Sequence, residues 1–195
     1  MDDKDYLRTI FAAHVELMQM AATGAVDSLS RASELIFHAL LSGHKLIGCG
    51  DAAGTSLVRY FCTLLLGRCE RRRPGLPAVS LADNTGTLMA IHDEFDPEQV
   101  FARQINTLGQ AGDILLVVCS APSRPRISGA TAAAHERDLG IVALGPEEDT
   151  ALERSLLPSD VLIALPGTDQ TRNQELNLVY LHALCELIDR QLLGE

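Results

Sequence analysis

Apolar residues recur along this chain with two different spacings. From residue 45 onward, short runs that are apolar at nearly every position alternate with longer segments in which apolar residues recur every three or four positions. The first spacing is typical of strands buried in a parallel sheet, and the second is typical of amphipathic helices. The expected strands are residues 45–49, 78–82, 113–120, 141–145 and 160–166. The expected helices are residues 6–20, 29–41, 55–67, 85–95, 97–109, 126–140 (closed by Gly140) and 171–193.

This alternation predicts an α/β fold: a three-layer αβα sandwich around a doubly wound, parallel, five-stranded sheet with right-handed crossovers. Two N-terminal helices and a long C-terminal helix complete it. The N-terminal helices, within residues 1–43, have no strand partner, so we expect them to pack on the core and on neighbouring subunits. The helix at residues 55–67 is apolar nearly all round, which predicts burial on most sides. Ligands of such sheets bind beyond the carboxyl ends of the strands.

Length and composition narrow the class of protein. The 195 residues suit one domain, and the formal net charge of −10 disfavours direct binding of nucleic acid. No apolar run approaches the length of a membrane span, and the N-terminus lacks a signal-peptide core, so we expect a cytoplasmic protein without membrane contact. The five cysteines form no Cys-x-x-Cys pair and are interpreted as buried free thiols.

One segment is strongly basic although the chain as a whole carries a net negative charge. Arg68, Arg71, Arg72 and Arg73 lie within six residues of one another. Such a cluster can hold a phosphate or an acidic partner. The favoured interpretation is a solvated helix end, where cations suit the helix dipole.

The stretch KLIGCGDAAG, residues 45–54, offers a dinucleotide-binding interpretation, since Gly48, Gly50 and Ala53 satisfy G-x-G-x-x-A. That fingerprint needs an acidic residue about 20 positions later, at the end of the next strand. Glu70 has the spacing but precedes the strand, and Asp83 follows the strand but comes too late. This interpretation is therefore disfavoured.

Several motifs in order favour another family. They are CGDAAGTS at residues 49–56, GRCERRRPGLPA at 67–78, LGQAGDILL at 108–116, and QE at 174–175 followed by a helix that ends LIDRQL. Together they resemble the sugar isomerase (SIS) domain of the phosphoheptose isomerase group, which includes the DnaA initiator-associating protein. The resemblance covers residues 1–195 as a single SIS domain with a flavodoxin-like sheet.

The resemblance implies a homotetramer that isomerises sedoheptulose 7-phosphate, with a Glu and a His as acid and base. Some members hold zinc through His, Glu, Gln and His side chains. In this chain the catalytic glutamate position falls on Leu64 and the first zinc-ligand position on Tyr60, whereas Gln174 and His182 remain. We therefore expect no zinc and no other cofactor, and we interpret His182 as a base that has lost its partner.

The phosphate-binding turns also depart from the family pattern. Asp51 replaces a family asparagine, small residues replace glycine and serine after it, and residues 119–124 lose hydroxyls at three positions. Pro122 removes one backbone donor. We expect Asp51 to cap the following helix through Gly54 or Thr55. The candidate ligand-binding residues are Gly50, Asp51, Ala53, Gly54, Thr55, Asp93, Ser120, Ser123, Arg124 and Gln174, and the candidate acid–base residue is His182.

Three hypotheses follow. The first is a non-catalytic SIS-domain protein, a homotetrameric adaptor in replication initiation with DnaA as its partner. The second is an active sedoheptulose 7-phosphate isomerase or a related aldose–ketose phosphate isomerase. The third is a sensor that binds a sugar phosphate without reacting.

Overall fold

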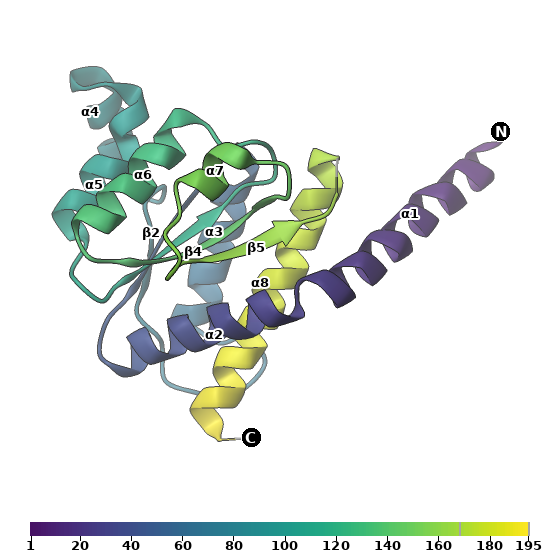
Figure 1. Ribbon diagram of the computed structural model, residues 1–195, viewed down its shortest axis with the longest axis horizontal. Coiled ribbons are helices and arrows are strands. Elements are labelled where there is room, and N and C mark those ends of the chain that lie inside the picture. The colour runs from purple at the N-terminus through teal and green to yellow at the C-terminus, as the bar shows by residue number, and fades with distance from the viewer. Residues whose placement is uncertain (168, 195) are drawn as a thin grey trace.

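The computed structural model describes residues 1–167 and 169–194, and a five-stranded parallel sheet lies at its centre (Figure 1). The strands are β1 (Leu46–Gly50), β2 (Ala78–Ser80), β3 (Ile114–Val118), β4 (Gly140–Pro146) and β5 (Val161–Leu165). Their order across the sheet is β2-β1-β3-β4-β5, and every neighbouring pair is parallel. The chain thus extends the sheet in both directions from the β1–β3 pair, which confirms the doubly wound topology.

Helices cover both faces of the sheet, so the three-layer prediction is confirmed. They are α1 (Asp3–Gly24), α2 (Val26–Leu41), α3 (Ala52–Leu66), α4 (Thr85–Glu94), α5 (Val100–Leu108) after a short 3-10 turn η1 (Pro97–Gln99), α6 (Pro125–Glu136), α7 (Thr150–Arg154) and α8 (Gln170–Leu193). One apolar core joins the sheet to α2, α3 and α8, and a second joins it to α5, α6 and α7. All residues of β1 and β3 are buried, as their unbroken apolar runs predict.

Two expectations about helices were wrong, and one short helix was not predicted. Helix α6 ends at Glu136, because the chain reverses through Asp138 at a positive φ of 57°, and Gly140 already belongs to β4. Helix α7, with five residues, is too short to show a period. Helix α3 is buried along one side only, and its Tyr60 and Leu66 are exposed.

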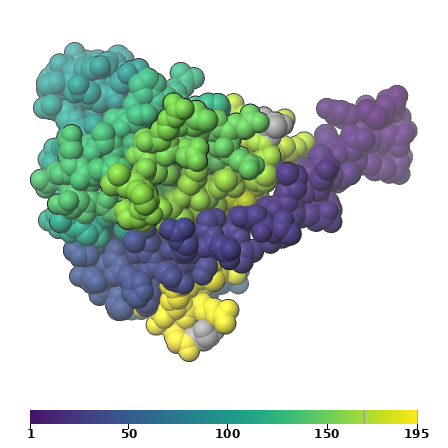
Figure 2. Space-filling model, viewed as in Figure 1, coloured from purple at the N-terminus to yellow at the C-terminus, as the bar shows by residue number. Residues whose placement is uncertain are grey.

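The two N-terminal helices differ in how much of their surface they bury. Helix α2 packs against α8 and β5 through fully buried Ala32 and Ile36. Helix α1 buries only Ala21 among its residues and extends away from the body of the protein (Figure 2). Helix α2 therefore packs on the core, whereas most of α1 does not, and contact of these helices with neighbouring subunits stays a prediction.

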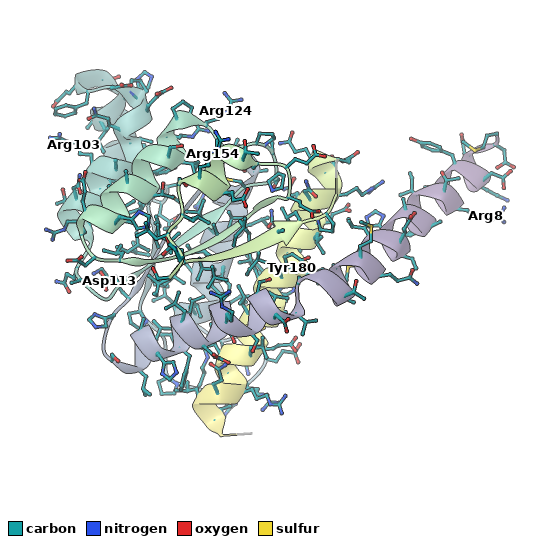
Figure 3. All side chains as sticks on the ribbon, in the orientation of Figure 1. Arg8, Arg103, Asp113, Arg124, Arg154 and Tyr180 are labelled. Carbon is teal, nitrogen blue, oxygen red and sulfur yellow. The ribbon has the colours of Figure 1, made fainter. Side chains whose placement is uncertain are left out.

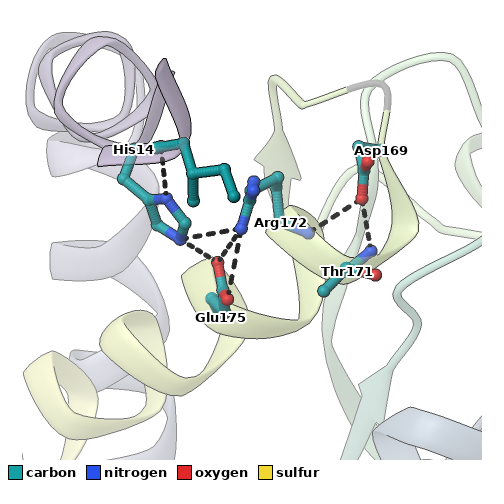
Figure 4. A network of polar contacts seen from close by, with 6 residues as sticks. His14, Asp169, Thr171, Arg172 and Glu175 are labelled. Atoms are coloured by element: carbon teal, nitrogen blue, oxygen red, sulfur yellow. Dashed lines mark hydrogen bonds and ion pairs between the residues drawn. The ribbon is translucent and has the colours of Figure 1, made fainter. Parts of the chain in front are cut away.

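A polar network ties the middle of α1 to the start of α8 (Figure 4). His14 Nε2 contacts Glu175 and lies 3.1 Å from Arg172 Nη1, while His14 Nδ1 lies 2.9 Å from the Ile10 carbonyl oxygen. Asp169 caps α8 by accepting from the backbone N–H groups of Thr171 and Arg172. The network fixes the point beyond which α1 leaves the core.

The basic cluster is solvated at Arg68, Arg71 and Arg72, as expected, but not at Arg73, and it lies in a loop after the helix. Helix α3 ends at Leu66, and the four arginines follow in a loop. The Arg73 side chain is fully buried and forms an ion pair with buried Asp189 of α8. Because burying a charge requires a partner, Arg73 is a structural residue, whereas Arg68 and Arg72 are exposed.

A second buried carboxylate lies directly before β3. Asp113 (Figure 3) accepts from the backbone N–H groups of Lys45 and Gln110 and pairs with Lys45 Nζ at 2.5 Å. Burial favours the neutral acid, but these hydrogen bonds and the Lys45 charge outweigh it and lower the pKa of Asp113. The carboxylate therefore links the starts of β1 and β3 in its charged form.

The cysteines are free thiols, and all except half-buried Cys69 are buried, as predicted. Burial raises the pKa of Cys49, Cys62 and Cys185 to about 12 and also raises that of Cys119, so these thiols stay protonated at neutral pH. Across the described part of the chain, no helix has both the length and the apolar character that a membrane span requires.

Candidate functional site

The candidate site lies where β1 and β3 end side by side. The chain leaves β1 at Gly50 and enters α3 one residue later, so the first turn of α3 lies against the end of β3. A Cβ at Gly50 would lie 2.4 Å from the Val118 carbonyl oxygen, and a Cβ at Gly54 would lie 1.8 Å from it. Only glycine permits this approach. The glycine at position 54, where the family carries serine, thus brings α3 close to β3.

Asp51 joins the two turns of the site. One carboxylate oxygen accepts from Gly54 N–H at 2.5 Å, which confirms the predicted helix cap. The other accepts from Ser120 N–H at 2.7 Å and from Ala121 N–H at 3.2 Å. The side chain is only 7% exposed. Asp51 therefore places a buried negative charge on the N–H groups of the turn that would meet a phosphate.

A second carboxylate takes the next donor of the same turn. Asp149 caps α7 through Leu152 N–H at 3.0 Å, and its other oxygen accepts from Ser123 N–H at 2.6 Å. The Ser123 hydroxyl donates to Asp149 as well. Pro122, between these donors, has no N–H. In residues 120–123, every backbone N–H thus has a carboxylate partner within this chain.

Helix α8 holds the end of β3 from the other side. Asn177 Nδ2 donates to the Cys119 carbonyl oxygen at 3.1 Å and to the hydroxyl oxygen of Ser120 at 3.3 Å. Ser120 is 1% exposed, so its hydroxyl belongs to the interior. The turn after β3 is therefore fixed by the carboxylates of Asp51 and Asp149 and by the amides of Asn173 and Asn177, all from this chain.

The candidate acid–base residue lies beside Tyr60. The hydroxyl of Tyr60 lies 3.0 Å from His182 Nε2, and the two rings meet edge to face with centroids 5.6 Å apart. Leu64, one turn along α3, is buried in the core shared with α8. The structure thus brings Tyr60 and His182 together, and at position 64 it offers an apolar wall that cannot exchange a proton.

The remaining candidates are more dispersed. The Thr55 hydroxyl donates to the Gly50 carbonyl oxygen within the β1–α3 turn, and Ala53 is half-buried beside it. Arg124 is exposed at the start of α6 (Figure 3). Asp93 is exposed on α4, which lies beyond α5 in Figure 1, and pairs with its neighbour His92.

The residues do not fit a zinc ion. The four family positions carry Tyr60, Leu64, Gln174 and His182, of which one is apolar and another has its Nε2 on the Tyr60 hydroxyl. Half-buried Gln174 lies on α8. In residues 1–167 and 169–194, no three His, Cys, Asp or Glu side chains gather closely enough to bind a metal.

Sequence reasoning missed Asp149, Asn173 and Asn177. Asp149 could have been found from its place directly before Thr150, where α7 begins, because aspartate is a preferred N-cap residue. The two asparagines lie one turn apart on the buried side of α8, where an apolar residue is the usual choice. A buried amide at this spacing signals a polar partner in the sheet, although the partner's identity comes only from the fold.

Comparisons with known proteins agree with this architecture. The family model described as SIS domain matches residues 10–145. The chain is 37% identical to a phosphoheptose isomerase of Methylococcus capsulatus over all of both chains. It is 36% identical to that of Alkalilimnicola ehrlichii over 100% of this chain and 99% of the relative. The solved phosphoheptose isomerase of Francisella tularensis superimposes with a TM-score of 0.93 at 26% identity, covering 97% of this chain and 100% of that one.

Proposed function

The chain belongs to the SIS-domain family, and from that premise we propose that it is a non-catalytic member of the phosphoheptose isomerase group that acts as an oligomeric adaptor. One observation carries the proposal. The carboxylate of Asp51 occupies the N–H groups of Ser120 and Ala121, which the resemblance assigns to a phosphate. A phosphate would have to displace a buried carboxylate and then lie beside it.

The acid–base chemistry points the same way. Moving a proton between two adjacent sugar carbons needs a group that can accept and return it within hydrogen-bond reach. Leu64 is a hydrocarbon in the glutamate position, and His182 is paired with Tyr60. A single histidine without its partner carboxylate supplies only part of the acid–base pair that the isomerase reaction uses.

An active phosphoheptose isomerase is the second candidate. It is favoured by the names of the relatives at 36–37% identity over the whole chain. His182 would be its proton carrier, with the Tyr60 hydroxyl 3.0 Å away as the partner acid. One assay separates the two candidates.

We expect the purified protein to interconvert sedoheptulose 7-phosphate with its aldose isomer no faster than buffer alone. The Methylococcus capsulatus relative, assayed at equal concentration, is the positive control, and product is measured by chromatography of the sugar phosphates. His182→Ala should change nothing. Turnover by the unmodified chain that disappears in His182→Ala would instead establish the isomerase.

The adaptor role draws support from the surface of α1. Leu7, Phe11, Val15 and Met18 recur at helical spacing along one side of this helix, and all four are exposed, Phe11 by 69%. An apolar stripe on a helix that stands clear of the core is typical of a protein contact. We propose that it contacts further copies of this chain in a homotetramer.

The double variant L7E/F11E should therefore lower the molar mass in solution by at least about half, because two charges would be buried in the contact. Light scattering coupled to size exclusion measures the mass. The control T9E/T23E adds the same charge at exposed positions on the other side of α1 and should keep the wild-type mass. If the two variants have equal molar masses, the apolar stripe of α1 does not form the oligomer contact.

The identity of the partner is the most specific part of the proposal. The chain resembles the DnaA initiator-associating branch, which also lacks the catalytic glutamate. We therefore propose that its partner is DnaA and that it acts in replication initiation, in the cytoplasm. Net charge of −10 supports contact with a protein over direct contact with DNA.

A further inference from the structure

A cavity of about 500 Å³ lies beside the end of β2, between α4 and α5. Its lining comprises residues 79–81 and 83–84, Thr87 and Ile91 of α4, and Arg103, Gln104, Thr107 and Leu108 of α5. Among the described residues of this lining, none belongs to the β1–α3 turn, to the turn after β3 or to the Tyr60–His182 pair. The cavity is therefore separate from the candidate site described above.

Gln104 presents an acceptor to this cavity. Its Nε2 donates to the carbonyl oxygens of Leu81 at 3.1 Å and Val100 at 2.8 Å. Because a carbonyl oxygen only accepts, these two contacts fix the orientation of the amide. Oε1 has no hydrogen-bond partner among the described residues, but it differs from the fully enclosed oxygens in that state, which lie on α8. Gln104 keeps 9% of its surface exposed, so a ligand in the cavity can reach this oxygen.

Hydroxyl groups of the same lining provide donors. Thr87 is half-buried on the first turn of α4. Its backbone N–H donates to Asn84, whereas its Oγ1 has no hydrogen-bond partner in the part of the chain that the structure describes. Ser80 Oγ accepts from Ala82 N–H at 3.3 Å, which leaves its hydroxyl hydrogen to donate. The cavity thus combines one open acceptor with two hydroxyl donors.

Apolar side chains form the walls around these polar groups: Val79, Leu81, Ile91 and Leu108. A flat aromatic ring fills an apolar slot of this kind, because its faces are apolar and its edge carries the hydrogen-bonding groups. A sugar, with hydroxyls on every side, would have to desolvate them against these walls. The lining therefore favours a heteroaromatic ring over a sugar.

Exposed Arg103 supplies a positive charge at the outer end of the cavity (Figure 3). Its guanidinium carbon lies 3.6 Å from the centroid of the Phe95 ring, and this cation–π contact positions the group. The guanidinium N–H groups have no hydrogen-bond or ion-pair partner among the described residues. Asp83, the one carboxylate of the described lining, is paired with Arg59 at 2.7 Å. An anion at this end therefore meets a guanidinium that is available to it.

We propose that this cavity binds an adenine mononucleotide. The exocyclic amino group of the base donates to Gln104 Oε1, and a neighbouring ring nitrogen accepts from the hydroxyl of Thr87 or Ser80. The base lies between the apolar walls, and the phosphate pairs with Arg103. The proposal goes beyond the adaptor role, because it requires neither isomerase activity nor its loss, and neither the isomerase assay nor the molar mass of the oligomer tests it.

Adenosine monophosphate is the probe, titrated into the full chain in a calorimeter. Its N6,N6-dimethyl derivative is the matched control, since it keeps the ring and the phosphate but has no N–H to donate. We expect adenosine monophosphate to bind and the dimethyl compound to bind at least about tenfold more weakly. Ribose 5-phosphate, which carries the anion without the base, should not displace the nucleotide at equal concentration.

Two pairs of variants test the geometry. Arg103→Gln should lower the affinity for adenosine monophosphate by about tenfold and leave that for adenosine unchanged, because only the phosphate meets the guanidinium. Arg68→Gln, an equal charge change at an exposed position outside the cavity, should keep the wild-type affinity. Thr87→Phe fills the cavity and should abolish binding, whereas Thr85→Phe, at an exposed position outside the lining, should not. Circular dichroism verifies that each variant folds.

Four results would overturn the proposal. They are no binding of adenosine monophosphate to the wild-type chain, equal affinity for the dimethyl compound, displacement by an equal concentration of ribose 5-phosphate, and equal affinities within either pair of variants. Equal losses in Arg103→Gln and Arg68→Gln would mean attraction by net charge alone.

Discussion

Arg73→Met should lower the free energy of unfolding by about 3–5 kcal/mol, the range observed when one partner of a buried ion pair is removed. The Arg73 guanidinium pairs with Asp189, which is 2% exposed. It also donates to the carbonyl oxygens of Leu64 at 2.9 Å and Leu65 at 2.8 Å. Methionine fills similar volume but removes the ion-pair partner of Asp189 and the guanidinium donors to both carbonyls. The Leu65 carbonyl keeps the Leu76 N–H as a donor.

Urea unfolding followed by circular dichroism measures this loss. Arg72→Met is the matched control, since Arg72 is exposed one residue away and should change stability by less than about 0.5 kcal/mol. The double variant R73M/D189L removes both charges, so its free energy of unfolding should fall by less than that of R73M alone. If R73M and R72M unfold at the same urea concentration, the ion pair contributes nothing to stability.

Asp51→Ala should lower the free energy of unfolding by about 2–4 kcal/mol, because it leaves the N–H groups of Gly54, Ser120 and Ala121 without their acceptor. Asp51→Asn should also lower the free energy of unfolding, but by less than Asp51→Ala. An amide has one oxygen, so it can serve either α3 or the turn after β3, but not both. Thermal or urea unfolding compares the two variants with Asp93→Asn, an exposed carboxylate that should be neutral to within about 0.5 kcal/mol.

Asp51→Asn also tests the interpretation of the turn. Freeing the N–H groups of Ser120 and Ala121 should restore an anion site, so inorganic phosphate should raise the melting temperature of Asp51→Asn. The wild-type chain should respond to phosphate as it responds to chloride at equal ionic strength. A wild-type protein that phosphate stabilises specifically would show that Asp51 does not close the turn, and the sugar-phosphate sensor would then become the better interpretation.

The cap on α3 illustrates how far local sequence reasoning reaches. Asp51 stands before a helical segment, and its bond to Gly54 N–H follows from the capping preference of aspartate. The bonds to Ser120 and Ala121 span 69 and 70 residues of sequence. They exist because β1 and β3 are neighbours in the sheet, although β2 comes between them in the chain.

Arg73 shows the opposite outcome. Four arginines in a short segment predict a solvated cluster, since charged side chains are rarely buried. The partner that makes burial tolerable, Asp189, lies 116 residues further on, and nothing near Arg73 in sequence signals it. Local charge density therefore predicted the exposure of Arg68, Arg71 and Arg72 but not the burial of Arg73.

The sequence by itself determined the class of fold and the identity of each layer. Continuous apolar runs are stable only as strands buried on both faces, and helical periods between them require crossovers, so local periodicity fixes the α/β sandwich. Tertiary structure alone decided which polar groups meet: Asp51 with the turn after β3, Arg73 with Asp189, and Tyr60 with His182. Apolar burial depends on each residue's own character, whereas a hydrogen bond depends on the position of a second group that only the folded chain supplies.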